Sequence, residues 1–499
     1  MGTYLLGIDI GTSACKTVLF NARGGAVAMR ECPYSVSYPQ PGWAQQEPDD
    51  WWKAAVSGIR GVLEESGIRG TDIAGIGVDG QSWSMVAVDK DGAVLYPSPI
   101  WTDTRAGGEC EEMIRAVSRE VLFGCSGNAI TPGHTMPKVL WLKKHFPDIY
   151  AHAEKVLQSN GYIVYRLTGT MTQDLSQGYG WNCFDMDRGE WNAALCREAG
   201  IRLALLPRLC ECSEIAGRIT RQAAALTGLS EGTPVVAGGL DAACSTLGVG
   251  VIHPGETQEQ GGQAGGMSIC MDVCEPVHSL ILSRHVVPCR WLLQGGTTGG
   301  GGALKWFREQ LCPQMSFASM SEDATKAPCA GEVIFLPYMA GERSPLWNPE
   351  ARGVFFGLSF ATTRRQMVRA VMEGVAFSLR HNLDTAEAAG VYAGTLRATG
   401  GSCNSPVWMQ IKADITGRRI EVPQAETAAA WGAAILAGIG SDVFESWEEA
   451  VGSIQVMRSY EPDLNRSVLY EKQYQKYLRL TETLGLLMHK ESGKIERSR

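Results

Sequence analysis

The stretch "LLGIDIGTSACKTVLF" (residues 5–20) places an acid, glycines, hydroxyl side chains and a lysine between two apolar runs. The apolar runs predict two strands, and glycine lets the backbone between them approach an anion closely. Backbone N–H groups of such a turn can form an anion-binding nest, to which Thr12, Ser13 and Lys16 add donors. Asp9 would then face a Mg²⁺ ion rather than the phosphates. A plain hairpin with a glycine in its turn fits this segment equally well.

The length of the chain predicts more than one domain. A chain of 499 residues exceeds the ~250 to 300 residues at which single hydrophobic cores stop growing. Strand and helix patterns alternate to about residue 250, which indicates an α/β fold. A second glycine-rich cluster, "GETQEQGGQAGG" at residues 255–266, then opens another β region. We therefore expect domains at 1–251 and 252–455, followed by a C-terminal helix and polar tail at 456–499.

Composition excludes several classes of function. The formal charge of −8 and pI near 5.6 argue against a nucleic-acid partner, because such proteins neutralise phosphates with clustered Lys and Arg. The sequence contains no run of 18 apolar residues, so no membrane span is expected. The first residues lack a basic segment and soon reach Asp9, unlike a signal peptide. The expected location is the cytoplasm.

A second acid follows a predicted strand in "VVAGGLDAACSTLGVG" (residues 235–250). An apolar strand runs into two glycines and Asp241, and small residues continue as a helix. Asp241 could be a helix N-cap, which contributes about 1 kcal/mol. The alternative role is a general base, because a carboxylate at a glycine-lined strand end can accept a proton from a substrate hydroxyl.

Two longer segments identify a family. "MPKVLWLKKH" (136–145) and "GVFFGLSFATTRRQMVRAVME" (353–373) resemble the two signatures of the FGGY family of carbohydrate kinases. The resemblance is to xylulokinase-like members and runs from about residue 4 to residue 440. It implies two ribonuclease-H-like domains of the actin and hexokinase superfamily, with an ATP and sugar cleft between them. It also implies phosphorylation of a sugar, a ketopentose such as xylulose or a related sugar or polyol, with ATP and Mg²⁺.

The resemblance also assigns residues. Asp241 falls on the catalytic base, and Asp9 on the acid beside Mg²⁺. In the second lobe the family usually has Gly-Thr-Ser in its turn, whereas this chain has Gln263 and Ala264 after Gly262. Two hydroxyl donors are therefore missing, although backbone N–H groups could still hold phosphate. The implied ATP-binding residues are Gly11, Thr12, Ser13, Lys16, Gly262, Gln263, Gly301, Gly400, Gly401 and Asn404.

The expected sugar contacts depart from the xylulokinase pattern. Where those enzymes carry Met-His-Gly, this chain has Ser82, Trp83 and Ser84, directly after Gln81. The Trp83 indole could stack on a sugar or simply fill the core. Asp103 is the other expected sugar contact, with an ion pair to Arg105 as its alternative role. A different pentulose, a tetritol or another polyol therefore competes with D-xylulose. The implied substrate-binding residues are Gln81, Ser82, Trp83, Asp103 and Asp241.

Two other functions compete with a sugar kinase. Actin-like ATPases share the two-lobed nucleotide cleft but lack the FGGY signatures. A degenerate, non-catalytic family member would account for the missing hydroxyls of the second turn. Retention of both Asp9 and Asp241 favours an active enzyme. The expected partner is a small-molecule sugar or polyol, and the interpretation leaves room for a homodimer.

Overall fold

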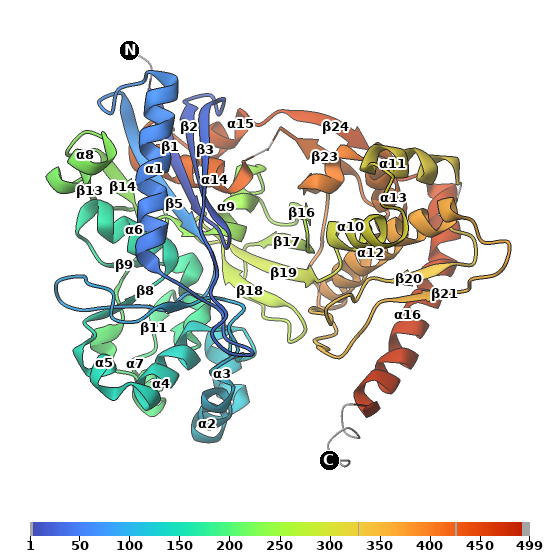
Figure 1. Cartoon of the computed structure of the whole chain (residues 1–499), viewed down its shortest axis with the longest axis horizontal. Helices are drawn as coiled ribbons and strands as arrows, with labels where there is room; N and C mark the ends of the chain where they lie inside the picture. Colours follow the sequence, from blue (N-terminus) through green and yellow to red (C-terminus); the bar gives the residue numbers. More distant parts are fainter. Residues whose placement is uncertain (1–2, 328, 425–426, 492–499) are drawn as a thin grey trace.

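Two seven-stranded sheets form two lobes that lie side by side in the computed structural model (Figure 1). It describes residues 3–327, 329–424 and 427–491, without the side chains of 489–491. The first sheet has the order β13-β14-β5-β1-β2-β3, with β15 also beside β5, and the second has the order β18-β19-β17-β16-β22-β23-β24. The first comprises β1 (Tyr4–Ile10), β2 (Ala14–Asn21), β3 (Ala26–Pro33), β5 (Ile73–Gly80), β13 (Ile215–Arg218), β14 (Pro234–Val236) and β15 (Gly239–Leu240). The second comprises β16 (Thr257–Gly261), β17 (Gly265–Met271), β18 (Ile281–Arg284), β19 (Trp291–Thr297), β22 (Leu396–Thr399), β23 (Ile420–Pro423) and β24 (Val456–Tyr460).

Helices and short strands surround the sheets. The helices are α1 (Pro48–Ser66), α2 (Gly107–Val117), α3 (Arg119–Ser126), α4 (Thr135–His145), α5 (Pro147–His152), α6 (Ser159–Thr168), α7 (Ala193–Glu198), α8 (Arg221–Thr227), α9 (Asp241–Gly248), α10 (Gly301–Leu311), α11 (Phe317–Lys326), α12 (Arg364–Ala388), α13 (Pro406–Thr416), α14 (Ala428–Gly440), α15 (Trp447–Gly452) and α16 (Leu464–Glu491). The remaining elements are β4 (Gln45–Gln46), β6 (Val86–Val88), β7 (Ser98–Pro99), β8 (Lys155–Leu157), β9 (Thr172–Asp174), β10 (Phe184–Asp185), β11 (Glu190–Trp191), β12 (Arg208–Cys210), β20 (Ile334–Leu336), β21 (Val354–Phe356), and the 3₁₀ helices η1 (Leu175–Trp181), η2 (Leu203–Leu205) and η3 (Gly401–Asn404). No helix in the described part of the chain is both long and apolar enough to cross a membrane.

The two lobes repeat one arrangement of strands. β1 pairs antiparallel with β2 and parallel with β5. In the second lobe β16 pairs antiparallel with β17 and parallel with β22. Each lobe therefore places a glycine-containing hairpin turn at one end of its sheet, as the sequence predicts. The predicted α/β class with two lobes is confirmed.

Successive side chains of β1 point to opposite faces of the first sheet, and the two faces pack against different helices. Leu6, Ile8 and Ile10 belong to the apolar cluster that includes α1 and α6. Gly7 points to the opposite face, where a methyl group would lie 2.0 Å from the Ala430 carbonyl oxygen of α14. Glycine is required there because the helix backbone approaches the strand so closely. A helix from the last fifth of the chain thus covers the first sheet.

The end of the second lobe lies beyond the expected boundary at residue 455. β24 pairs antiparallel with β23 and forms an edge of the second sheet. The long helix α16 then packs against α13 and β20. Residues 456–460, at the start of the expected C-terminal helix and polar tail, are therefore part of the second sheet, and the helix of that segment packs against this lobe.

Candidate active site

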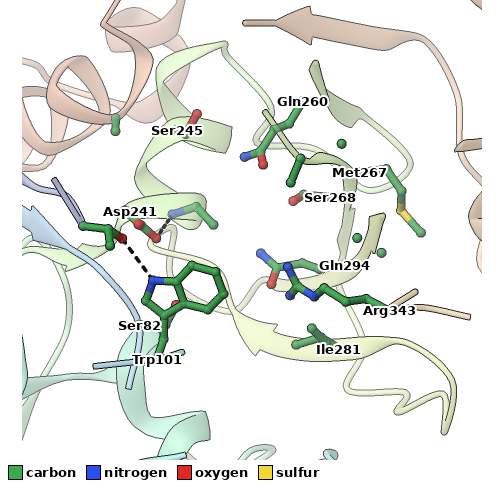
Figure 2. A pocket seen from close by; sticks show the side chains of 18 of the residues that line it. Ser82, Trp101, Asp241, Ser245, Gln260, Met267, Ser268, Ile281, Gln294 and Arg343 are labelled. Atoms are coloured by element: carbon green, nitrogen blue, oxygen red, sulfur yellow. Dashed lines mark hydrogen bonds between the residues drawn. The ribbon is translucent and has the colours of Figure 1, made fainter. Parts of the chain in front are cut away.

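Two hollows that share lining residues lie between the lobes, and a third is lined by the second lobe alone. The central hollow, about 440 Å³, receives Asp9, Ser82 and Trp101 from the first lobe and Gln294 and Arg343 from the second. Figure 2 shows Asp241, Ser82 and Trp101 on one side of it and Gln260, Gln294 and Arg343 on the other. A hollow of about 190 Å³ shares Asp9 and Ser245 with the central one and adds Lys16, Thr399 and Gly400. A third, about 630 Å³, is lined by Gly262, Gln263, Gly301, Gly401 and Asn404.

Three carboxyl groups meet where the strands of the first sheet end. Asp9 on β1 lies in register with Asp79 on β5, and β15 runs parallel to β5 and leads directly into Asp241. Because the carboxyl ends of parallel strands share one edge of a sheet, all three acids lie at that edge, and Asp9 and Asp241 line the central hollow. The sequence predicts Asp9 and Asp241 there, whereas Asp79 is a finding of the structure.

The environment of these acids favours their neutral forms. Burial raises the pKa of Asp241 to about 7, and the nearby charge of Asp9 acts in the same direction. Burial also raises the pKa of Asp9, although the charge of Lys16 opposes this. Burial and then the charges of Asp9 and Asp241 raise the pKa of Asp79 well above its usual range. A carboxyl group with a pKa near 7 suits proton transfer at neutral pH.

Asp241 does not cap helix α9. The N-cap position is Leu240, and Asp241 is the first helical residue. One carboxylate oxygen accepts a hydrogen bond from the backbone N–H of Ala242 at 2.6 Å. This is the only hydrogen bond of the carboxylate within the described residues. The side chain lines the central hollow, so it faces any molecule bound there.

Aromatic side chains form the wall of the central hollow beside Ser82. Trp83 has a φ of 58°, which is strained for a residue with a large side chain. Its ring packs edge-on against His134 and Tyr179, with centroids 4.6 Å and 5.3 Å away. The Tyr179 hydroxyl donates to Ser82 Oγ at 3.1 Å. Trp83 and Ser82, the expected sugar contacts, line the central hollow, and Tyr179 joins them from η1.

Lys138, within the first signature segment, holds this wall in place. Its Nζ donates to the carbonyl oxygens of Trp83 at 2.9 Å and Ile100 at 2.7 Å. Burial lowers the pKa of Lys138 to about 7. The residue after Ile100, Trp101, donates from its indole nitrogen to Thr12 Oγ1 at 3.0 Å. One buried amine thus fixes two segments that carry cleft-lining tryptophans.

Three predicted site residues do not line the hollows. Gln81 is buried behind the first turn, where its amide donates to Gln46 at 2.8 Å. Ser13 is exposed at the tip of that turn. Asp103 is fully buried and pairs with Arg105 at 2.8 Å, which is the alternative role that the sequence left open. Its carboxylate also accepts from the Ala44 backbone N–H, so the structure does not bring it to the cleft.

Arg343 is the main cleft residue that sequence reasoning missed. Within the described residues its guanidinium forms no hydrogen bond or ion pair, although the side chain lines the central hollow. It follows Glu342, whose carboxylate accepts from Thr297 Oγ1 at 2.6 Å and is therefore occupied.

The acids fit a divalent cation only in company with a nucleotide. In the described ranges no three His, Cys, Asp or Glu side chains gather closely enough to hold a metal ion. Mg²⁺ is commonly bound by one or two carboxylates together with substrate phosphates and water. Asp9 faces the two smaller hollows and offers such a carboxylate.

Comparison with known proteins decides the family. The N-terminal domain model of the FGGY family of carbohydrate kinases matches residues 4–248, and its C-terminal domain model matches 269–441. The chain belongs to this FGGY family. This kinase is 32% identical to a xylulose kinase of Bacillus subtilis over 89% of this chain and 90% of the relative. It is also 32% identical to an L-xylulose/3-keto-L-gulonate kinase of Escherichia coli, over 97% and 98% of the two chains.

Solved structures agree with this assignment. The FGGY kinase superposes on a crystal structure of xylulose kinase from Rhodospirillum rubrum with a TM-score of 0.91 and 30% identity, over 97% of this chain and 100% of the other. The predicted fold of two domains of the actin and hexokinase kind is confirmed. The protein is an enzyme that phosphorylates a sugar, and its family implies ATP as the phosphate donor. The assignment disfavours the actin-like ATPase.

Proposed function

We propose that this kinase transfers the γ-phosphoryl group of ATP to a hydroxyl of a small sugar or polyol, with Asp241 as the general base. The observation that carries the proposal is the position of Asp241: a carboxylate with a pKa of about 7, facing the central hollow between Asp9 and the aromatic wall. A ketopentose such as xylulose is the first candidate substrate, because relatives over nearly the whole chain are named for xylulose or L-xylulose.

In the proposed reaction the sugar hydroxyl loses its proton to a carboxylate oxygen of Asp241. The hydroxyl oxygen forms a bond to the γ-phosphorus as the bond to the β-phosphate oxygen breaks, and ADP leaves. A Mg²⁺ ion held by Asp9 and the nucleotide phosphates would offset negative charge when bound. Lys16 and the backbone of Gly11 would bind phosphate, and Arg343 would face the sugar or the transferred group from the second lobe.

The nucleotide would lie along the two outer hollows. Gly400 borders the hollow that contains Asp9 and Lys16, and Gly401 and Asn404 border the larger one. Gly262, Gln263 and Gly301 line the same larger hollow, beside the apolar side chains of Leu304 and Phe317. Such a site offers apolar surface to a base at one end and backbone N–H groups to phosphates at the other.

The test is an ADP-release assay with ATP and Mg²⁺ across ketopentoses, tetritols, pentitols and aldonic acids. Asp241→Asn and Asp241→Ala are assayed beside the parent enzyme, with circular dichroism to check their folding. We expect one substrate class to give activity that falls about 10²- to 10⁴-fold in both variants. ADP release without any sugar, or equal activity in the variants, would reject the proposal.

A further inference from the structure

Arg343 is a partly buried cation without a partner in the described part of the chain. Its guanidinium forms neither a hydrogen bond nor an ion pair there. The residues on either side of it are bound to β19. Glu342 accepts from Thr297 Oγ1 at 2.6 Å, and Ser344 Oγ accepts from the Gly296 N–H at 2.6 Å. The neighbours therefore hold Arg343 in place, and the adjacent carboxylate is occupied, although a partly buried charge is usually paired.

The second sheet places Gln294 beside this arginine. A methyl group at Gly296 would lie 3.3 Å from the guanidinium carbon of Arg343, so the guanidinium lies over this glycine. Gln294 is two residues earlier on β19 and therefore shares the same face of the sheet. Its amide nitrogen has no acceptor among the described residues, and its side chain lines the central hollow. Figure 2 shows Gln294 and Arg343 on the side of the hollow opposite Asp241 and Ser82.

The charges around the central hollow indicate what these donors bind. Among the described residues that line it, Arg343 is the only cation, whereas Asp9 and Asp241 contribute two carboxyl groups. A guanidinium and an amide N–H are hydrogen-bond donors, and the guanidinium matches the paired oxygens of a carboxylate or a phosphate. Neither Arg343 nor Gln294 lines the two hollows proposed for the nucleotide. An anion held by both residues therefore belongs to the sugar or to its phosphorylated product.

We infer that Arg343 and Gln294 form an oxyanion subsite that binds a negatively charged group of the sugar substrate or product. Two groups have this chemistry. One is a carboxylate that an acidic sugar brings with it, and the other is the phosphoryl group that the sugar receives. The inference rests on the proposed function for the place of the sugar, and it adds the class of ligand that the second lobe recognises.

This role and a structural role predict different effects on stability. Arg380 of the same lobe is the matched residue, since its side chain is 19% exposed and pairs with Glu471 at 2.5 Å. Arg380→Gln breaks that pair and should lower the melting temperature. Arg343→Gln breaks no ion pair in the described part of the chain, so its melting temperature should stay the same or rise. Anion affinity should fall only for Arg343→Gln.

The experiment measures binding to the full-length enzyme by isothermal titration calorimetry, without nucleotide or Mg²⁺. The probes are D-gluconate, D-xylulose 5-phosphate and inorganic phosphate, with D-xylulose as the neutral reference. We expect the parent to bind at least one anion more tightly than D-xylulose. The affinity for that anion should fall about 10- to 100-fold in Arg343→Gln, and about 2- to 10-fold in Arg343→Lys and in Gln294→Leu. Arg380→Gln should keep the affinity within about twofold, as distant sites usually behave independently.

The probe whose binding depends on Arg343 identifies the source of the anion. Loss of D-gluconate binding would identify a carboxylate, and loss of D-xylulose 5-phosphate or phosphate binding would identify the transferred phosphoryl group. The inference is overturned if the parent binds no anion more tightly than D-xylulose, or if Arg343→Gln keeps anion affinity within about twofold. Unchanged affinity together with a lower melting temperature would assign Arg343 to structure.

The titration is independent of the substrate assay, because no phosphoryl group is transferred in it. A protein that binds an anion through Arg343 but phosphorylates no sugar would contradict the proposed function and keep this inference. An enzyme that needs Asp241 to phosphorylate a sugar, but binds anions equally well in Arg343→Gln, would do the reverse.

Discussion

The hairpin turn between β1 and β2 and the turn between β16 and β17 occupy the same place in their lobes, yet they carry different chemistry. In each, an acid precedes the first glycine by two residues: Asp9 before Gly11, and Glu259 before Gly261. Glu259 is buried and pairs with Lys412 at 2.6 Å, and the same amine donates to Ser402 at 3.0 Å. Asp9 has no ion pair within the described residues and lines the cleft.

The turns themselves differ for a packing reason. Gly301 and Gly302, at the start of α10, donate backbone hydrogen bonds to the carbonyl oxygens of Gly262 at 2.7 Å and Gln263 at 2.9 Å. A methyl group at Gly300 would lie 2.3 Å from the Ala264 carbonyl carbon. The second turn is thus bound to a helix, whereas the first presents Thr12 and Lys16 to the cleft. The acid of the first turn therefore lines the cleft, whereas the acid of the second turn is paired inside its lobe.

The largest effect expected from this difference is on stability. Glu259→Gln leaves the Lys412 ammonium buried without its counter-charge, and such a loss costs about 3 to 5 kcal/mol. Chemical denaturation measures the change in the free energy of unfolding. The double variant Glu259→Leu/Lys412→Met, which removes both charges, should recover most of the loss. If the double variant is as unstable as Glu259→Gln, the loss of stability does not come from the unpaired charge of Lys412.

The corresponding change in the first lobe should act on catalysis instead. Asp9→Asn removes the carboxylate that is proposed to hold Mg²⁺ beside the phosphates, so we expect kcat/KM to fall about 10²- to 10³-fold, as for other lost electrostatic contacts at the reacting group. The melting temperature should stay the same or rise, because the substitution breaks no ion pair of Asp9 within the described residues. The assay is ADP release at saturating Mg²⁺, with Glu259→Gln as the counterpart. Comparable activity losses in both variants would contradict the division of roles.

Asp9, Asp241 and the glycine turns were predictable because each lies at the end of a short apolar run, where a polar residue must leave the core. Asp79 was not singled out, since "IAGIGVDG" equally describes a buried strand that ends at a glycine. Its significance comes from the register with Asp9, which local sequence does not encode. Asp103 was interpreted as a sugar contact because a carboxylate suits hydroxyls, but the neighbouring Arg105 folds back onto it.

The remaining features that local sequence does not predict depend on packing between segments that are far apart in the chain. Arg343 and Tyr179 reach the same hollow from segments over 160 residues apart in the chain, and only the packing of the two lobes against each other brings them together. An alanine- and glycine-rich segment forms α14. That it covers the first sheet depends on glycines in β1 and β5 that leave room for its backbone. Such complementarity between distant segments has no local signature.

The pH dependence of kcat/KM tests the acids of the first lobe that have no ion pair in the described part of the chain. The pKa of Asp241 is raised to about 7, so the base is protonated and inactive below that pH. We expect kcat/KM to fall about tenfold per pH unit below 7, reaching about 100-fold at pH 5. Raising the pH removes the proton from Asp241 and so activates the enzyme. The value of kcat/KM therefore rises with pH and becomes constant above the pKa. The residual activity of Asp241→Asn should not fall below pH 7 in this way. A kcat/KM of the parent enzyme that does not change with pH would contradict the role of Asp241 as the base.

The smallest expected effect concerns the missing hydroxyls of the second turn. Gln263→Thr combined with Ala264→Ser restores the Thr-Ser pair that the family usually carries there, and each new hydrogen bond contributes about 0.5 to 1.5 kcal/mol. We expect the KM for ATP to fall about 2- to 10-fold. Ser13→Ala in the first turn should leave it within about twofold, because the exposed Ser13 side chain lines none of the hollows. Steady-state kinetics with ATP varied at saturating sugar measures both. If the restored turn binds ATP no better while Ser13→Ala binds it worse, the phosphates depend on side chains in the first lobe and on backbone N–H groups in the second. If neither variant changes KM, backbone groups hold the nucleotide in both lobes, and the two turns differ only in their acids.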